Sequence, residues 1–186
     1  MKKVFAILLI SFFVFDASGQ YNSKLSAQAW VDSVFESLSK EEKISQLMVI
    51  RAHSNLGPEH VQQVTDLITK YNVGALCFFQ GGPVRQANLT NFYQSIAKTP
   101  LMVTIDAEWG LGMRLDSVIK FPYQLTLGAL PNEQLVYEIG KAVGEQCKRI
   151  GIHVNYAPVV DVNNNPNNPV IGYRSFGEDK YKVAQL

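Results

Sequence analysis

The sequence predicts an α/β protein built around a parallel sheet, and three observations support this. Short apolar runs alternate with longer segments of helical periodicity along most of the chain. The apolar runs are nearly continuous, which is typical of strands buried on both faces of a parallel sheet. The 186 residues are 47% hydrophobic and 18% charged, a composition typical of globular proteins. The length suits one domain or part of a larger one.

The first residues predict an export signal. Lys2 and Lys3 precede an apolar run from Val4 to Phe15, and small residues follow at positions 17–19. This pattern is typical of a secretory signal peptide, and about a dozen apolar residues are too few to span a bilayer. We therefore expect residues 1–19 to be removed and the mature protein to be periplasmic or extracellular. The alternative is an N-terminal membrane anchor.

Helices and strands then follow in alternation. Residues 20–37 form a helical lead-in, because apolar side chains recur at helical spacing from Ser26 to Leu38. Ser39 and Glu42 have the spacing of a capping box. We expect strands at 47–50, 73–79, 101–105 and 153–160, and further helices at 58–71, 84–97 and 132–150. This order fits either an open doubly wound sheet or the first four units of an eight-stranded barrel.

Polar residues gather after the third and fourth expected strands. Asp106, Glu108, Trp109 and Arg114 follow the third strand, and Arg174 lies in the long loop after the fourth. In both architectures ligands bind at the carboxyl ends of the strands. Carboxylates, planar guanidinium groups and an indole face suit a polyhydroxylated sugar. The sequence therefore predicts a sugar site at this edge of the sheet.

Three of these residues also have a plainer interpretation. Asp106 is suited to cap its own loop, and Arg174 is spaced to pair with Glu178 one helical turn away. Trp109 is large enough to fill the end of the fold without touching a ligand. Spacing alone does not separate these interpretations from sugar binding.

Composition and missing motifs exclude several classes of function. With 17 basic and 16 acidic residues the net charge is +1, so we expect no nucleic-acid partner and no stable membrane association after signal removal. Gln80–Pro83 lacks the lysine and the glycine spacing of a phosphate loop, and no Gly-x-Ser-x-Gly elbow is present. The three histidines share no metal-ligand spacing, so we expect no metal and no cofactor. Cys77 and Cys147 are expected to be buried thiols rather than a bridge.

Four stretches resemble the N-terminal catalytic barrel of glycoside hydrolase family 3, at residues 38–47, 73–76, 105–108 and 155–162. The loop at 165–179 is the most specific and resembles the β-N-acetylglucosaminidase branch. The resemblance implies that residues 38–186 form the first four units of a (β/α)8 TIM-type barrel. The chain would then be the amino-terminal half of a longer catalytic domain.

The same resemblance implies a retaining glycosidase without a cofactor. It would release terminal β-linked N-acetylglucosamine from an oligosaccharide or glycopeptide. The resemblance assigns sugar binding to Asp106, Arg114 and Arg174, with Glu108 and Trp109 as further candidates. The family's nucleophile and acid/base would lie beyond Leu186, so the 186-residue chain alone is expected to be inactive.

Three other functions stay open at this point. The first is a β-glucosidase of the same family. The second is a secreted protein that binds a sugar through Asp106, Arg114 and Arg174 without hydrolysing it. The third is an open-sheet domain whose loops bind another protein.

Overall fold

The computed structural model describes residues 25–186, and the expected signal peptide lies outside them. The chain divides into two compact units at Glu36. The described part of the first unit is occupied by α1 (Ala27–Ser37), which confirms the predicted lead-in helix, although none of its residues is buried. The second unit, Ser37–Leu186, contains the sheet.

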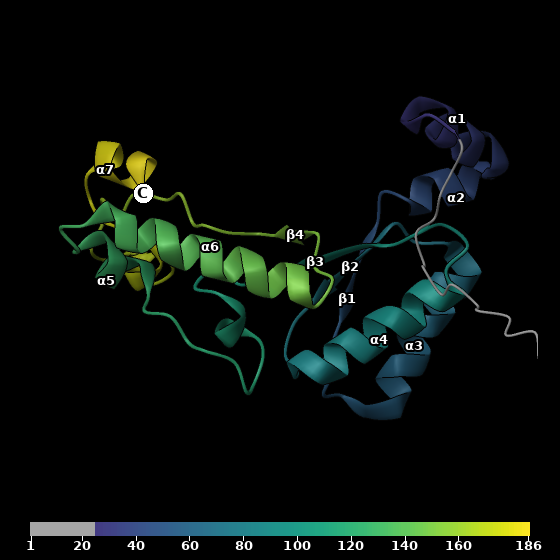
Figure 1. The fold of residues 1–186 in the computed structure, drawn as a ribbon, viewed down its shortest axis with the longest axis horizontal. Helices are drawn as coiled ribbons and strands as arrows, with labels where there is room; N and C mark the ends of the chain where they lie inside the picture. Colours follow the sequence, from purple (N-terminus) through teal and green to yellow (C-terminus); the bar gives the residue numbers. More distant parts are fainter. Residues whose placement is uncertain (1–24) are drawn as a thin grey trace, which may run out of the picture. The chain divides into compact units, whose positions relative to one another are not determined.

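Four parallel strands form one sheet in the order β1-β2-β3-β4 (Figure 1). They are β1 (Val49–Ala52), β2 (Ala75–Phe78), β3 (Met102–Ile105) and β4 (Val154–Asn155). All four residues of β2 are buried, as its continuous apolar run predicts. The first strand begins two residues later than expected, because the amides of Leu47 and Met48 still bond back to the preceding helical turn.

The fourth strand is only two residues long, so the prediction of a strand at 153–160 is wrong for most of that range. Backbone hydrogen bonds from His153 and Tyr156 to β3 continue the pairing by one residue on each side of β4. The pairing ends before Pro158, whose nitrogen has no hydrogen to donate to a ladder. His153 is exposed rather than the start of a buried strand, and its Nδ1 accepts the N–H of Val103 at 2.9 Å.

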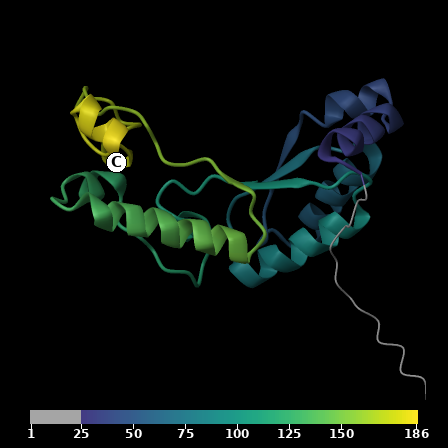
Figure 2. The same ribbon diagram turned by 45° about the horizontal axis from the view of Figure 1, so that its top comes forward.

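The predicted helices are all present. α2 (Lys40–Ser45) precedes β1, and the helices between the strands are α3 (Gly57–Tyr71), α4 (Pro83–Ile96) and α6 (Glu133–Arg149). The capping box that opens α2 is confirmed, because Ser39 and Glu42 each accept the backbone N–H of the other. Figures 1 and 2 show α3 and α4 side by side, and α6 alongside the chain that leaves β4. No helix within residues 25–186 has the length and apolar character needed to cross a membrane.

The two long loops contain short elements that the sequence does not predict. The loop after β3 holds a 3-10 turn (Leu111–Met113) and α5 (Gln124–Gly128). The loop after β4 holds a second 3-10 turn (Gly172–Arg174) and leads into α7 (Lys180–Gln185). These elements are only three to six residues long, too short to show a helical period in the sequence.

The main core lies between the sheet and the helices. It includes Leu76, Phe78, Val103 and Ile105 from the strands, Val64 and Ile68 from α3, and Tyr93 from α4. A smaller cluster joins the two long loops to α6 and α7 through Leu127, Val136, Phe176 and Val183. Cys77 and Cys147 are free and buried, as expected.

The other face of the sheet is exposed in part. Val49, Met102 and Val154 on this face are 45%, 43% and 37% exposed, whereas Ala75 and Thr104 on the same face are buried. Alternate residues of a strand point to opposite faces of its sheet. In a closed barrel a face like this one forms the interior.

Candidate functional site

The candidate site begins where β3 ends. Asp106 directly follows β3, and Glu108 lies two residues further on. Asn155 of β4 holds the residue between them, since its Oδ1 accepts the N–H of Ala107 at 3.0 Å and its Nδ2 donates to the carbonyl of Ala107 at 3.1 Å. These two bonds fix the backbone from which both carboxylates extend.

Asp106 is paired with Arg114. Nη2 of Arg114 donates to Oδ2 of Asp106 at 2.6 Å, and Nε donates to the Asp106 carbonyl at 2.6 Å. The guanidinium also lies over the ring of Phe79, 4.5 Å from its centroid. The Arg114 side chain is 13% exposed and that of Asp106 is 32% exposed. Oδ1 of Asp106 accepts no hydrogen bond from the described residues, so a ligand hydroxyl has an acceptor there.

Glu108 is paired with Arg174, although 66 positions separate them in the sequence. Nε of Arg174 donates to Oε2 of Glu108 at 2.8 Å, and Nη2 donates to Oε1 at 2.5 Å. Nη1 donates to the carbonyl of Val170 at 3.1 Å. The Glu108 side chain is 7% exposed. Arginine has five N–H groups, so one hydrogen on Nη1 and one on Nη2 are left for a ligand.

The two ion pairs lie within electrostatic range of each other. The pKa of Arg174 is raised, first because Glu108 accepts its hydrogen bonds, and further by the negative charges of Glu108, Asp106 and Asp161. The loops after β3 and β4 therefore meet through Glu108 and Arg174, and Glu108 lies two residues beyond Asp106. The alternative pairing of Arg174 with Glu178 does not occur, because Glu108 and the Val170 carbonyl take its bonds.

Three aromatic rings contact one another, and two of them belong to Trp109 and Tyr173, which adjoin Glu108 and Arg174 in the sequence. The ring of Trp109 lies 4.8 Å from that of Tyr123 and 6.2 Å from that of Tyr173, between centroids, and the two tyrosine rings are 4.5 Å apart. Tyr123 and Tyr173 are 46% and 52% exposed, and Trp109 is partly buried. Sequence reasoning identified only Trp109. Tyr123 and Tyr173 lie elsewhere in the sequence, and the folding of the loops brings their rings into contact with Trp109.

Sequence reasoning also missed two rings beside Arg114. Phe79 follows β2, and His53 follows β1 and stacks on Phe79 with 5.8 Å between centroids. The pKa of His53 is lowered, first by burial and then by the positive charges of His60, Arg51 and Arg114. Both residues occupy the carboxyl ends of strands, so the rule that identified Asp106 applies to them too. Within residues 25–186 no three His, Cys, Asp or Glu side chains are grouped to hold a metal ion.

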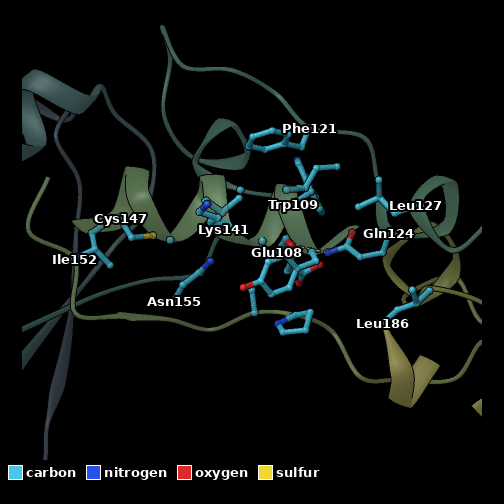
Figure 3. Close-up of a pocket in the computed structure, with 18 of the residues that line it drawn as sticks. Glu108, Trp109, Phe121, Gln124, Leu127, Lys141, Cys147, Ile152, Asn155 and Leu186 are labelled. Carbon is cyan, nitrogen blue, oxygen red and sulfur yellow. Dashed lines mark hydrogen bonds between the residues drawn. The ribbon is translucent and has the colours of Figure 1, made fainter. Parts of the chain in front are cut away.

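A cavity of about 980 Å³ has Glu108 in its wall (Figure 3). Its walls come mainly from α6 and from the chain between Ile152 and Pro158. Glu108 and Trp109 line it, whereas Asp106, Arg114 and Arg174 do not. The cavity is therefore bounded by α6 and by the chain that follows β3 and β4, and we take the two ion pairs as the candidate site.

Known proteins resemble most of the chain. Residues 39–186 match the family model described as "Glycosyl hydrolase family 3 N terminal domain". Beta-hexosaminidase A of Pseudoalteromonas piscicida is 36% identical over 148 residues, which are 73% of this chain and 24% of that protein. Beta-hexosaminidase LpqI of Mycobacterium tuberculosis is 32% identical over 156 residues, 79% of this chain and 37% of that protein. The chain thus spans about a quarter to somewhat over a third of these relatives.

A solved structure resembles the chain in the same way. The family 3 β-N-acetylglucosaminidase from Paenibacillus sp. str. FPU-7 matches with a TM-score of 0.71 and 33% identity, over 81% of this chain and 30% of that chain. From the family match, the sequence relatives and this shared architecture, we conclude that the chain belongs to glycosyl hydrolase family 3 as part of its N-terminal domain.

Proposed function

We propose that the protein carrying this chain hydrolyses O-glycosyl bonds and releases terminal β-linked N-acetylglucosamine. The observation that carries the proposal is the presence of two ion pairs after the carboxyl end of β3, in which Arg114 binds Asp106 and Arg174 binds Glu108. The names of the relatives support the choice of sugar, since two are β-hexosaminidases and one is a β-N-acetylglucosaminidase. The substrate class would be an oligosaccharide or glycopeptide that ends in this sugar.

Each charged residue has a separate role in this proposal. Asp106 accepts a sugar hydroxyl at Oδ1, while Arg114 holds its other carboxylate oxygen. Arg174 donates its two remaining N–H groups to the same sugar. Glu108 is a positioning residue, because both of its carboxylate oxygens already accept from Arg174. Bonds that tighten as the pyranose flattens toward an oxocarbenium ion lower the barrier to hydrolysis.

The bond-breaking groups are proposed to come from outside this chain. In a retaining mechanism a carboxylate attacks the anomeric carbon while an acid protonates the leaving oxygen, and water then releases the sugar from the enzyme. Asp106 is bound to Arg114, so it suits hydroxyl binding better than attack. We place the nucleophile and the acid/base beyond Leu186, in keeping with the 24% and 37% of the two relatives that the chain spans.

The proposal extends to the domain limits and the location of the protein. Residues 1–19 would be a signal peptide, residues 20–37 a lead-in, and residues 38–186 the first half of a TIM-type barrel. The basic start and the apolar run that follows support export to the periplasm or the extracellular space. The partly exposed face of the sheet, with Met102 43% exposed, supports a barrel that further strands close.

Substitution of Asp106 in the full-length protein tests the function. Asp106→Ala should lower kcat/KM on an aryl β-N-acetylglucosaminide by about 100-fold, since a hydrogen bond to a charged group contributes about 1.5–3 kcal/mol and a tenfold change in rate corresponds to about 1.4 kcal/mol. Asp66→Ala, which removes an exposed carboxylate from α3, is the matched control and should keep its activity.

Three other outcomes would contradict parts of the proposal. An Asp106→Ala protein that no longer folds would support the loop-capping role. Faster turnover of an aryl β-glucoside than of the N-acetylglucosaminide would assign the protein to glucosidases. Tight binding of N-acetylglucosamine without any turnover by the wild-type protein would identify a sugar-binding protein.

A further inference from the structure

We propose that Trp109, Tyr123 and Tyr173 form a second sugar-binding surface, which we name the aromatic shelf. It would stack against the sugar to which the terminal N-acetylglucosamine is joined. The inference rests on the proposed function, because it takes Asp106 and Arg174 as the site of the terminal sugar. It deepens that function by naming an oligosaccharide, rather than a single sugar on a small group, as the preferred substrate.

The three rings hold one another in place. The planes of Trp109 and Tyr123 are 82° apart, those of Trp109 and Tyr173 are 64° apart, and those of the two tyrosines are 48° apart. Edge-to-face and tilted contacts of this kind are favourable arrangements for aromatic rings. The rings come from three separate segments, the turn after β3, the start of α5 and the second 3-10 turn. Their mutual contact therefore produces a surface with a defined shape.

The aromatic shelf is attached to the residues that position Arg174. Trp109 follows Glu108, and Tyr173 precedes Arg174. Tyr123 precedes Gln124, whose Nε2 donates to the carbonyl of Glu108 at 2.6 Å. Each shelf residue is thus covalently next to a residue of the Glu108–Arg174 network. We therefore place the next sugar of the oligosaccharide on the shelf when Arg174 holds the terminal one.

The two tyrosine rings of the shelf are accessible to a ligand. Tyr123 and Tyr173 are 46% and 52% exposed, although each has two aromatic neighbours. Exposed apolar clusters beside polar groups commonly mark binding sites. Aromatic faces pack against the C–H face of a pyranose, while phenol and indole groups at the rim donate hydrogen bonds.

The test compares two substrates that share a terminal sugar, using the full-length protein. N,N′-diacetylchitobiose has a second pyranose, whereas methyl β-N-acetylglucosaminide has only a methyl group in that place. We measure released N-acetylglucosamine and take the ratio of kcat/KM for the first substrate to that for the second. Tyr173→Ala and Trp109→Ala should each lower this ratio by about tenfold, and Tyr173→Phe should keep most of it.

The matched control is Tyr71→Ala, at a tyrosine of α3 that is 45% exposed and remote from the shelf, and its ratio should equal that of the wild-type protein. An unchanged ratio in both shelf variants would overturn the shelf. An equal fall in kcat/KM for both substrates would also overturn the shelf, because it shows a loss of activity that does not depend on the second sugar. If Tyr173→Ala fails to fold, Tyr173→Leu keeps apolar volume without the ring and is judged by the same ratio.

The experiment separates failure of the shelf from failure of the proposed function. If the wild-type protein releases N-acetylglucosamine and the ratio does not change in the variants, the shelf is wrong and the function stands. If the wild-type protein releases no sugar, the function is wrong, and calorimetric titration with diacetylchitobiose then tests the shelf. Weaker binding by Tyr173→Ala than by Tyr71→Ala would support it, and equal binding would overturn it.

Discussion

Removal of Glu108 should destabilise the protein by leaving Arg174 without its partner. The change is Glu108→Ala, which deletes both acceptors of the hydrogen bonds that measure 2.8 and 2.5 Å. Breaking a fully buried ion pair costs about 3–5 kcal/mol. The Glu108 side chain is only 7% exposed, but that of Arg174 is 31% exposed, so water recovers part of the lost solvation. We therefore expect a loss of about 2 kcal/mol in the free energy of unfolding.

Urea unfolding of Glu108→Ala, Arg174→Ala and the double variant measures this in a double-mutant cycle. The coupling energy should exceed about 1 kcal/mol, because the two side chains are in direct contact. For a domain of this size the single variant should also lower Tm by about 4–8 °C. Glu108→Gln keeps the volume of the side chain and separates the loss of charge from the loss of packing.

The exposed ion pair between Arg85 and Asp116 provides the comparison. Arg85 and Asp116 are joined at 2.5 Å, but their side chains are 53% and 56% exposed. Exposed pairs contribute little, because water screens the charges and ordering the side chains costs entropy. If the coupling energy between Glu108 and Arg174 is no larger than that between Arg85 and Asp116, burial does not strengthen the Glu108–Arg174 ion pair, and the reasoning is refuted.

Two further predictions concern packing and pH. Gly128→Ala should cost about 1–3 kcal/mol of stability in urea unfolding, because its added methyl group would overlap the backbone carbonyl of Phe176. Gly144→Ala in α6, where nothing lies within 4 Å, should instead stabilise by about 0.5–1 kcal/mol, and equal effects would contradict the packing argument. The lowered pKa of His53 means that the folded state resists its protonation. Its contribution to stability should be complete above about pH 6.5 and lost as pH falls below that value, since the unfolded chain then binds more protons. Tm measured from pH 8 to pH 5 should fall less in His53→Phe than in the wild-type protein, and an equal fall would contradict the assignment.

Local sequence was sufficient to predict the regular part of the fold. Helical spacing of apolar residues located α3 and α6 to within one or two residues, and the capping box located the start of α2. The continuous apolar runs located β2 and β3, since burial on both faces leaves few positions for polar side chains. The convergence of polar residues followed from a rule about parallel sheets, so Asp106 and Arg114 could be identified before their contacts were known.

Tertiary structure decided the pairing within the site. Nothing near Arg174 in the sequence indicates Glu108 as its partner, and the nearer Glu178 was an equally reasonable choice. The pairing arises because Gly128 lets α5 approach the backbone of Phe176, which brings the loop after β4 against the loop after β3. The sequence alone thus determined the parallel sheet, its helices and the edge at which polar residues collect, because periodicity and capping act over a few neighbouring residues. Which charges and rings meet there was decided by close packing between distant loops that have no periodicity of their own.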